Sequence, residues 1–283
     1  MTKTDAIITT MNKQLFRNIT NSNIVQTEPI TYGISNKVFL INSSFVYRER
    51  MHKLDIFNSP NIENLVIDLI RPFDISEEVL FYNALTGTKI SKFIPNCYHY
   101  KTLMSDRELG FVASELQKLH KIKDAKLESF HLFERIEFYK NGVHSKHYLE
   151  EELQQSLTSA VQSWYHEEDF VLCHNDIIEF NILFREDRAF LIDWEFAMLN
   201  HPYSDLASVI GENYLESYEK QTVFLRSYFA DKYSSEKHRK VLEIRNLRFF
   251  EWYYWSLFMY AKRRQKVYME IALYFANCIK NLL

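Results

Sequence analysis

Three side chains in the second half of the chain have the types and the spacing that phosphoryl transfer requires. Asp176 is followed by Asn181 after four intervening residues, and Asp193 ends a short apolar run. Enzymes that move a phosphoryl group use one Asp to orient the attacking hydroxyl, and an Asn and a second Asp to hold magnesium at a triphosphate. We therefore expect Asp176 to be catalytic. We expect Asn181 and Asp193 to be metal ligands, because magnesium prefers oxygen donors.

The strength of this signal lies in the combination of residues. Any one of the three could be an ordinary turn former, since Asp and Asn are frequent in turns after strands. A histidine two positions before the first Asp, His174, adds to the specificity of the pattern. We interpret His174 as a structural residue that bonds the loop backbone. Asp205 is interpreted as a helix cap or as a brace for the same loop, and not as a catalytic residue.

The N-terminal third of the chain predicts a small β-rich lobe. Runs of strand-forming residues alternate with turn residues, and one helix is inserted between them. Residues 1–22 are expected to form an amphipathic helix. The segment 27–41 is expected to form a strand, a turn at 33–36 and a second strand; further strands are expected at 45–50, 79–82 and 89–94, and the helix at 60–70.

The rest of the chain predicts a larger and mainly helical lobe. This order is that of an α+β, protein-kinase-like two-lobe fold, with an antiparallel β-rich N-terminal lobe. We place an ATP-binding lobe at 1–94 and a catalytic and substrate-binding lobe at 95–283. Helices are expected at 105–120, 148–165, 204–213, 212–229, 237–263 and 266–282, with short strands at 170–173, 181–184 and 189–192 between them.

Composition excludes several classes of function. The formal net charge is −3 and the isoelectric point about 6.4, so no strongly basic surface points to nucleic acid. The five glycines form neither a Walker A loop nor a GxGxxG loop. The three cysteines lie far apart and are expected to be reduced thiols. No apolar signal core or membrane-spanning run is evident, so we expect a cytoplasmic protein without membrane insertion.

The motif segments strongly resemble those of the choline/ethanolamine kinases, and most of all their bacterial choline kinase branch. The resemblance rests on His-Asn-Asp at 174–176 leading to Asn-Ile-Leu at 181–183, on Ile-Asp-Trp-Glu-Phe at 192–196, and on Asn-His-Pro-Tyr-Ser-Asp-Leu-Ala at 200–207. It extends over roughly residues 27 to 275. Such a resemblance implies membership of the aminoglycoside phosphotransferase and protein-kinase-like superfamily, ATP as the co-substrate and Mg²⁺ as the cofactor.

The resemblance also assigns ATP-binding roles in the small lobe. A Gly-Ile-Ser-Asn turn is similar to the family's phosphate loop, so Ser35 and Asn36 are expected to contact phosphates. Backbone groups near Phe93 and Ile94 are expected to take the adenine.

A strand arginine is expected to replace the lysine that kinases use at the phosphates. The resemblance favours Arg48 for this role, although Arg50 has the same strand parity and could substitute. Glu63, on the first helix of the small lobe, is its expected ion-pair partner.

The family phosphorylates a small alcohol with a cationic head, and the chain has residues that could bind one. A quaternary ammonium donates no N–H hydrogen bonds, so aromatic faces and a carboxylate must hold it, each desolvated cation–π contact contributing on the order of 2 kcal/mol. Glu195 follows the metal Asp by two residues, and Trp252 and Trp255 share one helical face. Together with Asp176, the expected substrate-binding residues are Glu195, Phe196, Trp252, Trp255 and Tyr268.

Two departures weaken this cation site. Phe196 stands where the family has a tyrosine, and Ile271 replaces the second tyrosine of the family's Tyr-x-x-Tyr pair. The two tryptophans could also belong to a core stripe with their aromatic neighbours, since aromatic residues at helical spacing are often buried for packing alone.

We therefore expect an ATP- and Mg²⁺-dependent choline kinase that makes phosphocholine. Ethanolamine kinase is the nearest alternative, followed by a thiamine or aminoglycoside kinase, and a catalytically inactive ligand-binding relative is the alternative from another class. The expected partner is a small cationic alcohol, choline or ethanolamine, with no nucleic acid; oligomeric state is left open.

Overall fold

The computed structural model describes residues 13–30, 36–50, 57, 59–143 and 149–283. It divides into two compact units. The described part of Met1–Lys101, together with Glu179–Ala197, forms what we call the β-rich unit, and Thr102–Ile178 with Met198–Leu283 forms the helical unit. The assignment of ATP binding to residues 1–94 and of catalysis to residues 95–283 stays a prediction.

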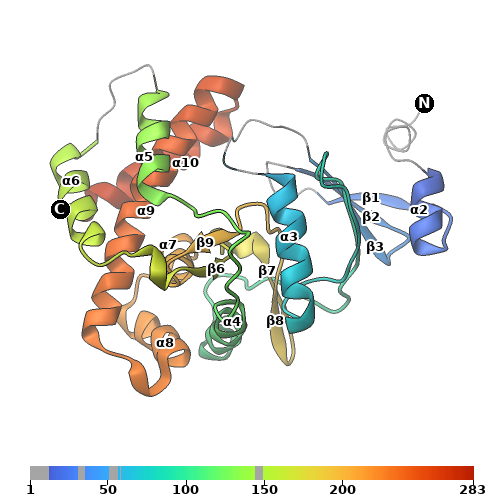
Figure 1. The fold of residues 1–283 in the computed structure, drawn as a ribbon, viewed down its shortest axis with the longest axis horizontal. Coiled ribbons are helices and arrows are strands. Elements are labelled where there is room, and N and C mark those ends of the chain that lie inside the picture. Colours follow the sequence, from blue (N-terminus) through green and yellow to red (C-terminus); the bar gives the residue numbers. More distant parts are fainter. Residues whose placement is uncertain (1–12, 31–35, 51–56, 58, 144–148) are drawn as a thin grey trace. The chain divides into compact units, whose positions relative to one another are not determined.

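The β-rich unit is built on a five-stranded antiparallel sheet, as the sequence predicts (Figure 1). The strand order is β1-β2-β3-β5-β4, so the fifth strand lies between the third and the fourth. In this register Arg48 lies opposite Val38 on one side and Lys89 on the other. The strands are β1 (Thr27–Ile30), β2 (Asn36–Ile41), β3 (Phe45–Arg50), β4 (Val79–Tyr82) and β5 (Lys89–Lys92).

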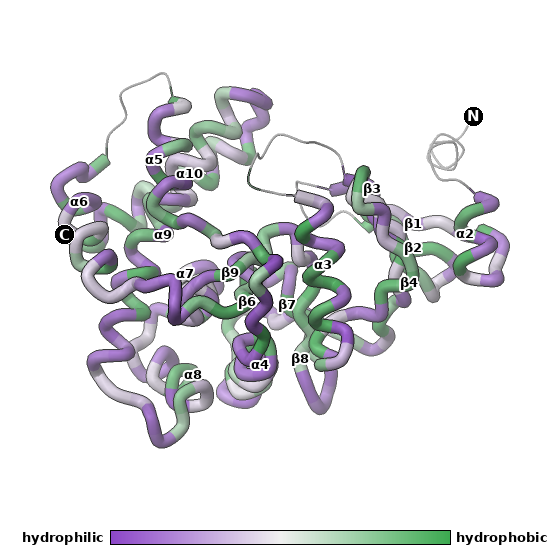
Figure 2. Tube along the Cα trace, in the orientation of Figure 1, coloured by the Kyte–Doolittle hydropathy of each residue, from purple (hydrophilic) through white to green (hydrophobic). Residues whose placement is uncertain are grey.

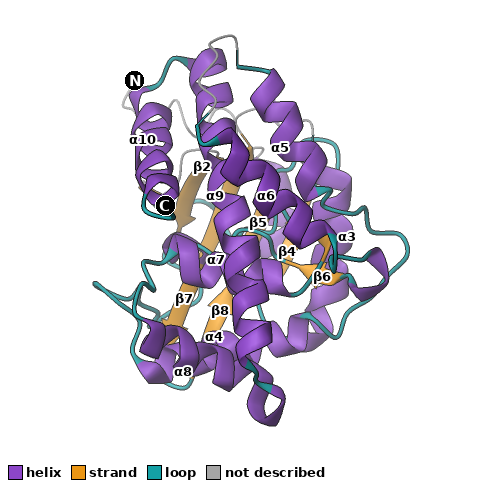
Figure 3. Cartoon of the chain, turned by 90° about the vertical axis from the view of Figure 1, so that its left-hand side faces the viewer, coloured by secondary structure: helices purple, strands orange, loops and turns teal. Residues whose placement is uncertain are grey.

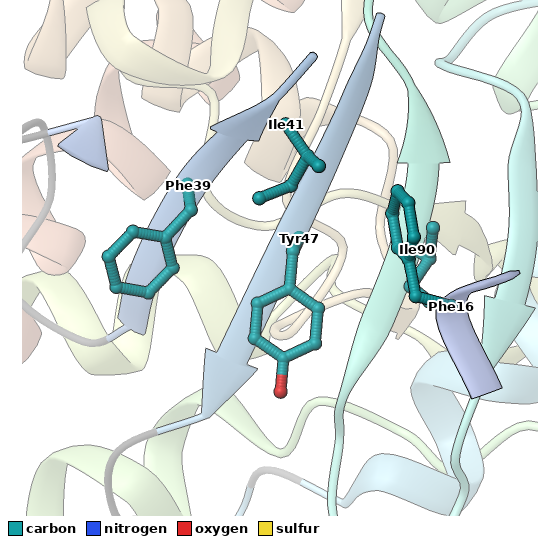
Figure 4. Packing of buried hydrophobic residues seen from close by; sticks show 5 residues of the cluster. All are labelled: Phe16, Phe39, Ile41, Tyr47 and Ile90. Carbon is teal, nitrogen blue, oxygen red and sulfur yellow. The ribbon is translucent and has the colours of Figure 1, made fainter. Parts of the chain in front are cut away.

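The two faces of this sheet have different roles, because successive side chains of a strand point to opposite faces. One face is a hydrophobic core that also receives Phe16 from helix α2 (Lys13–Thr20) (Figure 4). The alternate residues of β2 and β3, including Val38 and Arg48, line a pocket on the other face. The buried residues of the core cluster are Phe16, Phe39, Ile41, Tyr47 and Ile90.

A helix and a hairpin complete the β-rich unit. Helix α3 (Pro60–Ile70) has the predicted bounds; Pro60 occupies its first turn, where a missing N–H costs nothing. Both apolar and polar residues occur along α3 (Figure 2), and its buried residues, Glu63, Val66, Ile67 and Ile70, recur at helical spacing. The predicted hairpin is formed by β7 (Ile182–Arg185) and β8 (Arg188–Leu191), which pair antiparallel. Two short 3₁₀ turns, η1 (Arg71–Phe73) and η3 (Glu179–Asn181), follow α3 and precede β7.

The helical unit is arranged around one long helix, α9 (Ser235–Arg263), which contacts α5, α6, α7 and α10 (Figure 3). Two short strands of the same unit, β6 (Val171–Cys173) and β9 (Met198–Asn200), pair antiparallel. In the described part of the chain, none of the helices combines the length and apolar composition needed to cross a bilayer. The other helices are α4 (Asp106–Leu119), α5 (Leu132–Asn141), α6 (Glu151–Gln162), α7 (Tyr203–Glu212), α8 (Tyr218–Phe229) and α10 (Lys266–Lys280), with 3₁₀ turns η2 (Glu167–Asp169) and η4 (Ala230–Lys232).

The sequence did not predict α5 or β9, and it began α8 too early. Helix α5 buries Arg135 and Lys140, so its apolar stripe is interrupted by charges. Strand β9 has three residues, too few for a periodic pattern. Helix α8 begins only at Tyr218, because the Ser217 hydroxyl caps it by accepting from the Lys220 N–H.

Candidate active site

Arg48 is the centre of a buried ionic cluster in the β-rich unit. It is 3% exposed, and its guanidinium donates to the Glu63 carboxylate at 2.7 Å and to Asp193 Oδ1 at 2.8 Å. The Tyr82 hydroxyl donates a further hydrogen bond of 2.7 Å to Glu63. The ion pair expected between β3 and the first helix is therefore present, and Arg48 forms it.

Charge pairing, and not burial, decides the ionisation of this cluster. Burial by itself would lower the pKa of Arg48, but the charges of Glu63 and Asp193 raise that pKa well above its usual value. Burial would raise the pKa of Glu63, but the Arg48 charge holds that pKa below its usual value. Both groups therefore stay ionised at neutral pH, and a fixed cation faces the carboxylate of Asp193.

The two expected metal ligands flank the hairpin, Asn181 just before β7 and Asp193 two residues after β8. The Asn181 carbonyl accepts a 3.0 Å hydrogen bond from the Ile192 N–H, and Asp193 follows directly. Asp193 has φ 66°, in the left-handed region that Asp tolerates better than most residues. An amide oxygen and a carboxylate oxygen are donors that suit a hard cation, so this pair fits Mg²⁺.

Arg48, Asn181 and Asp193 line a pocket of about 390 Å³ within the β-rich unit. Its volume and mostly apolar lining are those of a small-molecule site. Phe93 and Ile94, the residues expected near an adenine, line it as well. Apolar residues in or next to the strands and the hairpin also contribute to it: Ile30, Val38, Leu40, Val46, Leu183 and Ile192.

The expected phosphate turn is only partly described. Asn36 is the first residue of β2. Ser35 lies outside the described residues.

The sequence did not predict a second ion pair in this pocket. Lys89 and Glu77 both line it, and their side chains are joined at 2.5 Å and are each less than a tenth exposed. Burial would raise the pKa of Glu77, but the Lys89 charge holds that pKa below its usual value. The alternation of side chains along β5 could have predicted this position for Lys89. Ile90 points into the core, so its neighbours Lys89 and Ser91 point to the opposite face of the sheet, where the pocket lies.

Glu195 is a buried carboxyl next to this cluster. It is 8% exposed, and burial together with the Asp193 charge raises its pKa to about 8, against the opposing charge of Arg48. Near neutral pH the carboxyl is therefore largely protonated, and it ionises more readily when a cation lies nearby. Phe196 follows it and is also buried.

Asp176 lies in the helical unit, in a turn that follows β6. Asp205 of α7 braces this turn: its carboxylate accepts hydrogen bonds from the N–H groups of His174 at 2.8 Å and Asn175 at 2.7 Å. Burial would raise the pKa of Asp205, but the hydrogen bond and charge of His120 hold that pKa below its usual value. Of the two interpretations of Asp205, the structure shows the loop brace.

The aromatic residues expected to bind a cation cluster in the helical unit. The rings of Trp252 and Trp255 have centroids 5.2 Å apart, and Trp255 contacts Tyr268 at 5.7 Å. Tyr268 is wholly buried, and its hydroxyl accepts a 2.6 Å hydrogen bond from Arg263. The guanidinium groups of Arg248 and Arg263 lie 5.7 Å from the ring centroids of Trp252 and Tyr268, respectively.

The structure thus brings together the expected residues within each unit. In the β-rich unit these residues are Arg48, Glu63, Phe93, Ile94, Asn181 and Asp193, and in the helical unit they are Trp252, Trp255 and Tyr268.

A model of the family described as the phosphotransferase enzyme family matches residues 95–244, which is more than half of the chain. The chain belongs to this phosphotransferase family. The matched segment includes the Asp176 turn and the hairpin that carries Asn181 and Asp193.

One curated relative of this phosphotransferase is the protein LicA from Haemophilus influenzae. The two are 29% identical over 162 residues, which cover 54% of this chain and 47% of LicA. The chain therefore spans about half the length of this relative.

Solved structures share the fold of this phosphotransferase. A choline/ethanolamine kinase family protein from Mesorhizobium loti gives a TM-score of 0.81 at 18% identity, over 100% of this chain and 95% of that chain. The choline kinase LicA from Streptococcus pneumoniae gives 0.78 at 18% identity, over 98% of this chain and 99% of that chain. The predicted protein-kinase-like fold, with an antiparallel β-rich N-terminal part and a mainly helical C-terminal part, is confirmed.

Proposed function

We propose that this phosphotransferase transfers the terminal phosphoryl group of ATP to the hydroxyl of choline, giving phosphocholine and ADP. The observation that carries the proposal is the pocket lined by Arg48, Asn181 and Asp193. A fixed cation for phosphate oxygens and two oxygen donors for a divalent metal are the groups that this chemistry requires. The family match supports the same reaction class.

ATP would occupy the pocket of the β-rich unit. Its adenine would lie among the apolar residues of β2, β3 and the hairpin, with backbone groups near Phe93 and Ile94 at its edge. Ser35, Asn36 and Arg48 would contact phosphate oxygens. Glu63 would keep the guanidinium of Arg48 in place.

Asn181 and Asp193 would hold Mg²⁺, which when bound neutralises charge on the phosphate oxygens. Asp193 also accepts a hydrogen bond from Arg48. Metal binding at Asp193 would therefore free this guanidinium nitrogen for a phosphate.

Asp176 would orient the alcohol and accept its proton at a carboxylate oxygen. The alcohol oxygen forms its bond to the terminal phosphorus as the bond from that phosphorus to the leaving ADP oxygen breaks. The buried Asp205 carboxylate accepts hydrogen bonds from two N–H groups of the turn, and this would restrict the movement of Asp176.

Choline is the proposed acceptor because of three features. Trp252, Trp255 and Tyr268 form an aromatic cluster, Glu195 and Phe196 follow the metal ligand Asp193, and the Streptococcus pneumoniae neighbour is named a choline kinase. Aromatic faces and a carboxyl group are the groups that recognise a quaternary ammonium.

Ethanolamine is the second candidate, and one observation favours it. Arg248 and Arg263 already lie over the rings of Trp252 and Tyr268, which leaves less aromatic face for a methylated cation. A primary ammonium would instead donate hydrogen bonds to a carboxylate such as Glu195.

One assay tests the proposal: Mg²⁺- and ATP-dependent ADP release with choline, ethanolamine, thiamine and kanamycin at matched concentrations. We expect the highest kcat/KM for choline. Asp176→Ala should abolish acceptor-dependent ADP release while its circular dichroism spectrum stays native. Choline turnover no faster than the acceptor-free background would refute the choline assignment. Full activity of Asp176→Ala would refute the assigned base.

A further inference from the structure

Arg248 is a buried cation of the helical unit that contacts more than the Trp252 ring. It lies on α9 and is 1% exposed. Its Nη2 donates a 2.9 Å hydrogen bond to the backbone carbonyl of Asn175, the residue before Asp176. The same guanidinium is paired with Glu212 at 3.0 Å and lies 3.5 Å from Glu251. One side chain therefore joins α9 to the turn that carries the proposed base.

The carbonyl that Arg248 holds belongs to a residue in an uncommon conformation. Asn175 has φ 64°, in the left-handed region that is uncommon for residues other than glycine but that Asn adopts more readily than most. Its N–H is bound by the Asp205 carboxylate at 2.7 Å, and its side-chain oxygen accepts from Asn200 at 2.7 Å. A buried anion thus holds the N–H of Asn175 and a buried cation holds its C=O. The two peptide units on either side of the Asn175 Cα are therefore each held by a buried charge, and the second of them, held by Arg248, leads into Asp176.

Arg248 remains charged in this environment. Burial by itself would lower its pKa, but Glu212, Glu251 and, to a smaller extent, Asp176 raise it above its usual value. The Asp176 charge is thus one of the charges that keep the guanidinium ionised.

The same helix carries the aromatic residues of the proposed substrate site. Arg248, Trp252 and Trp255 follow one another at helical spacing, and the guanidinium lies 5.7 Å from the ring centroid of Trp252. Glu212 interacts with both Arg248 and Trp252. The contacts therefore run from an indole of the aromatic cluster through a buried ion pair to the Asn175 carbonyl.

We propose that Arg248 is a positioning residue for phosphoryl transfer. By holding the Asn175 carbonyl, Arg248 keeps the Asp176 side chain at a fixed position relative to Trp252 on α9. The proposal rests on the proposed function, because it takes Asp176 as the group that receives the hydroxyl proton. Arg248 itself touches neither substrate in this scheme.

The test compares Arg248→Met and Arg248→Lys with a matched control, Arg135→Met. Arg135 is equally buried, and its Nε bonds Glu251 at 2.9 Å, so its removal takes a guanidinium from the same network and keeps the bond to Asn175. For each variant, kcat, both KM values, the melting temperature and amide hydrogen exchange of the segment 173–178 are measured.

We expect Arg248→Met to lower kcat by roughly 100-fold, the cost of a misplaced catalytic group, and to leave the KM for ATP within about 3-fold. Exchange in the segment 173–178 should rise. Arg248→Lys should recover part of kcat, since lysine keeps the charge but cannot donate from a planar fork to a carbonyl and a carboxylate together. Arg135→Met should lower the melting temperature by about as much as Arg248→Met does, but it should leave kcat within about 3-fold of the wild-type value.

Three outcomes overturn the inference, and they are distinguishable. An unchanged kcat in folded Arg248→Met would refute positioning while the kinase assignment stands. Equal kcat losses in Arg248→Met and Arg135→Met would reduce Arg248 to a packing role. A wild-type protein that releases no ADP above background with any of the four acceptors would refute the proposed function and this inference with it.

Discussion

Arg48 and Asp193 are hydrogen-bonded to each other at 2.8 Å within the β-rich unit. The contact joins a residue of β3 to the second residue after β8, 145 positions later. Because Glu63 holds a second nitrogen of the guanidinium, Arg48 keeps its place if Asp193 exchanges its partner. The cation proposed for phosphate and the carboxylate proposed for metal are therefore both in position before either ligand arrives.

The first prediction concerns Arg48 itself. Arg48→Met should raise the KM for ATP at least roughly 10-fold, since a charge-assisted contact to phosphate is lost. It also leaves Glu63 as a buried charge without its cation, which should lower the free energy of unfolding by about 3 kcal/mol in urea titrations. Arg50→Met is the matched control on the same strand and should leave the KM for ATP nearly unchanged. A larger effect of Arg50→Met would move the phosphate role to Arg50.

The second prediction concerns the metal. Chelation with EDTA should abolish ADP release, and Asp193→Asn should remove the additional thermal stabilisation that Mg²⁺ gives in the presence of ATP. In the absence of ligands the variant should lose no more than about 1 kcal/mol, because the Asp193 side chain is 31% exposed and its ion pair is partly solvated. Asp187→Asn, an exposed acid on the turn of the same hairpin, is the control and should keep the Mg²⁺ effect. Retention of that effect in Asp193→Asn would exclude Asp193 as a ligand.

Local sequence signals were sufficient for much of the fold and for part of the site. Pro60 and the apolar spacing after it defined α3, and the charged turn at 185–188 defined the β7–β8 hairpin. The sequence left Asp205 as a helix cap or a loop brace, and its bonds to the N–H groups of His174 and Asn175 decide for the brace. For α3 and the hairpin, residues close together in the sequence determine the structure.

The residues that escaped prediction depend on distant partners. Arg248 reads as a surface cation of a helix until its bond to Asn175, 73 positions earlier, is seen. Helix α5 was not predicted for the same reason. Its buried Arg135 interrupts the apolar pattern, and the charge of Arg135 is compensated by Glu251, 116 positions later. A buried charge is tolerated only when it is paired, and single-sequence patterns do not reveal the pairing.

The third prediction concerns pH. Burial, only partly opposed by Asp169, lowers the pKa of His201 from 6.5 to about 4. The unfolded chain therefore takes up a proton at this site at higher pH than the folded one. The contribution of neutral His201 is fully present above pH 6.5 and is lost as the pH falls toward 4, by about 3 kcal/mol in total.

His201→Phe tests this contribution. Phenylalanine keeps a ring against Tyr165, whose ring lies 5.7 Å away in stacked geometry, but it takes up no proton. The difference in unfolding free energy between wild type and variant should change by about 3 kcal/mol between pH 7 and pH 4, in favour of the variant at low pH. Parallel pH profiles for the two proteins would show that His201 does not titrate in this window.

The fourth prediction concerns the acceptor. Trp255 and Tyr268 are buried, so alanine substitutions would open cavities, and Trp252→Phe and Trp255→Phe are the cleaner changes. Tryptophan gives the strongest cation–π contact, so each change should weaken choline binding by about 1 kcal/mol, a rise in KM of about 5-fold, with the KM for ATP unchanged. The KM for ethanolamine should change less if its ammonium is held by hydrogen bonds to a carboxylate.

Trp164→Phe is the control, because that indole also lies in the helical unit and has a cation over its ring, Lys240, 5.1 Å from the ring centroid. Equal changes in the KM for choline and the KM for ATP would show that the two tryptophans serve packing and do not bind the acceptor. Changes of the same size in Trp164→Phe would show the same.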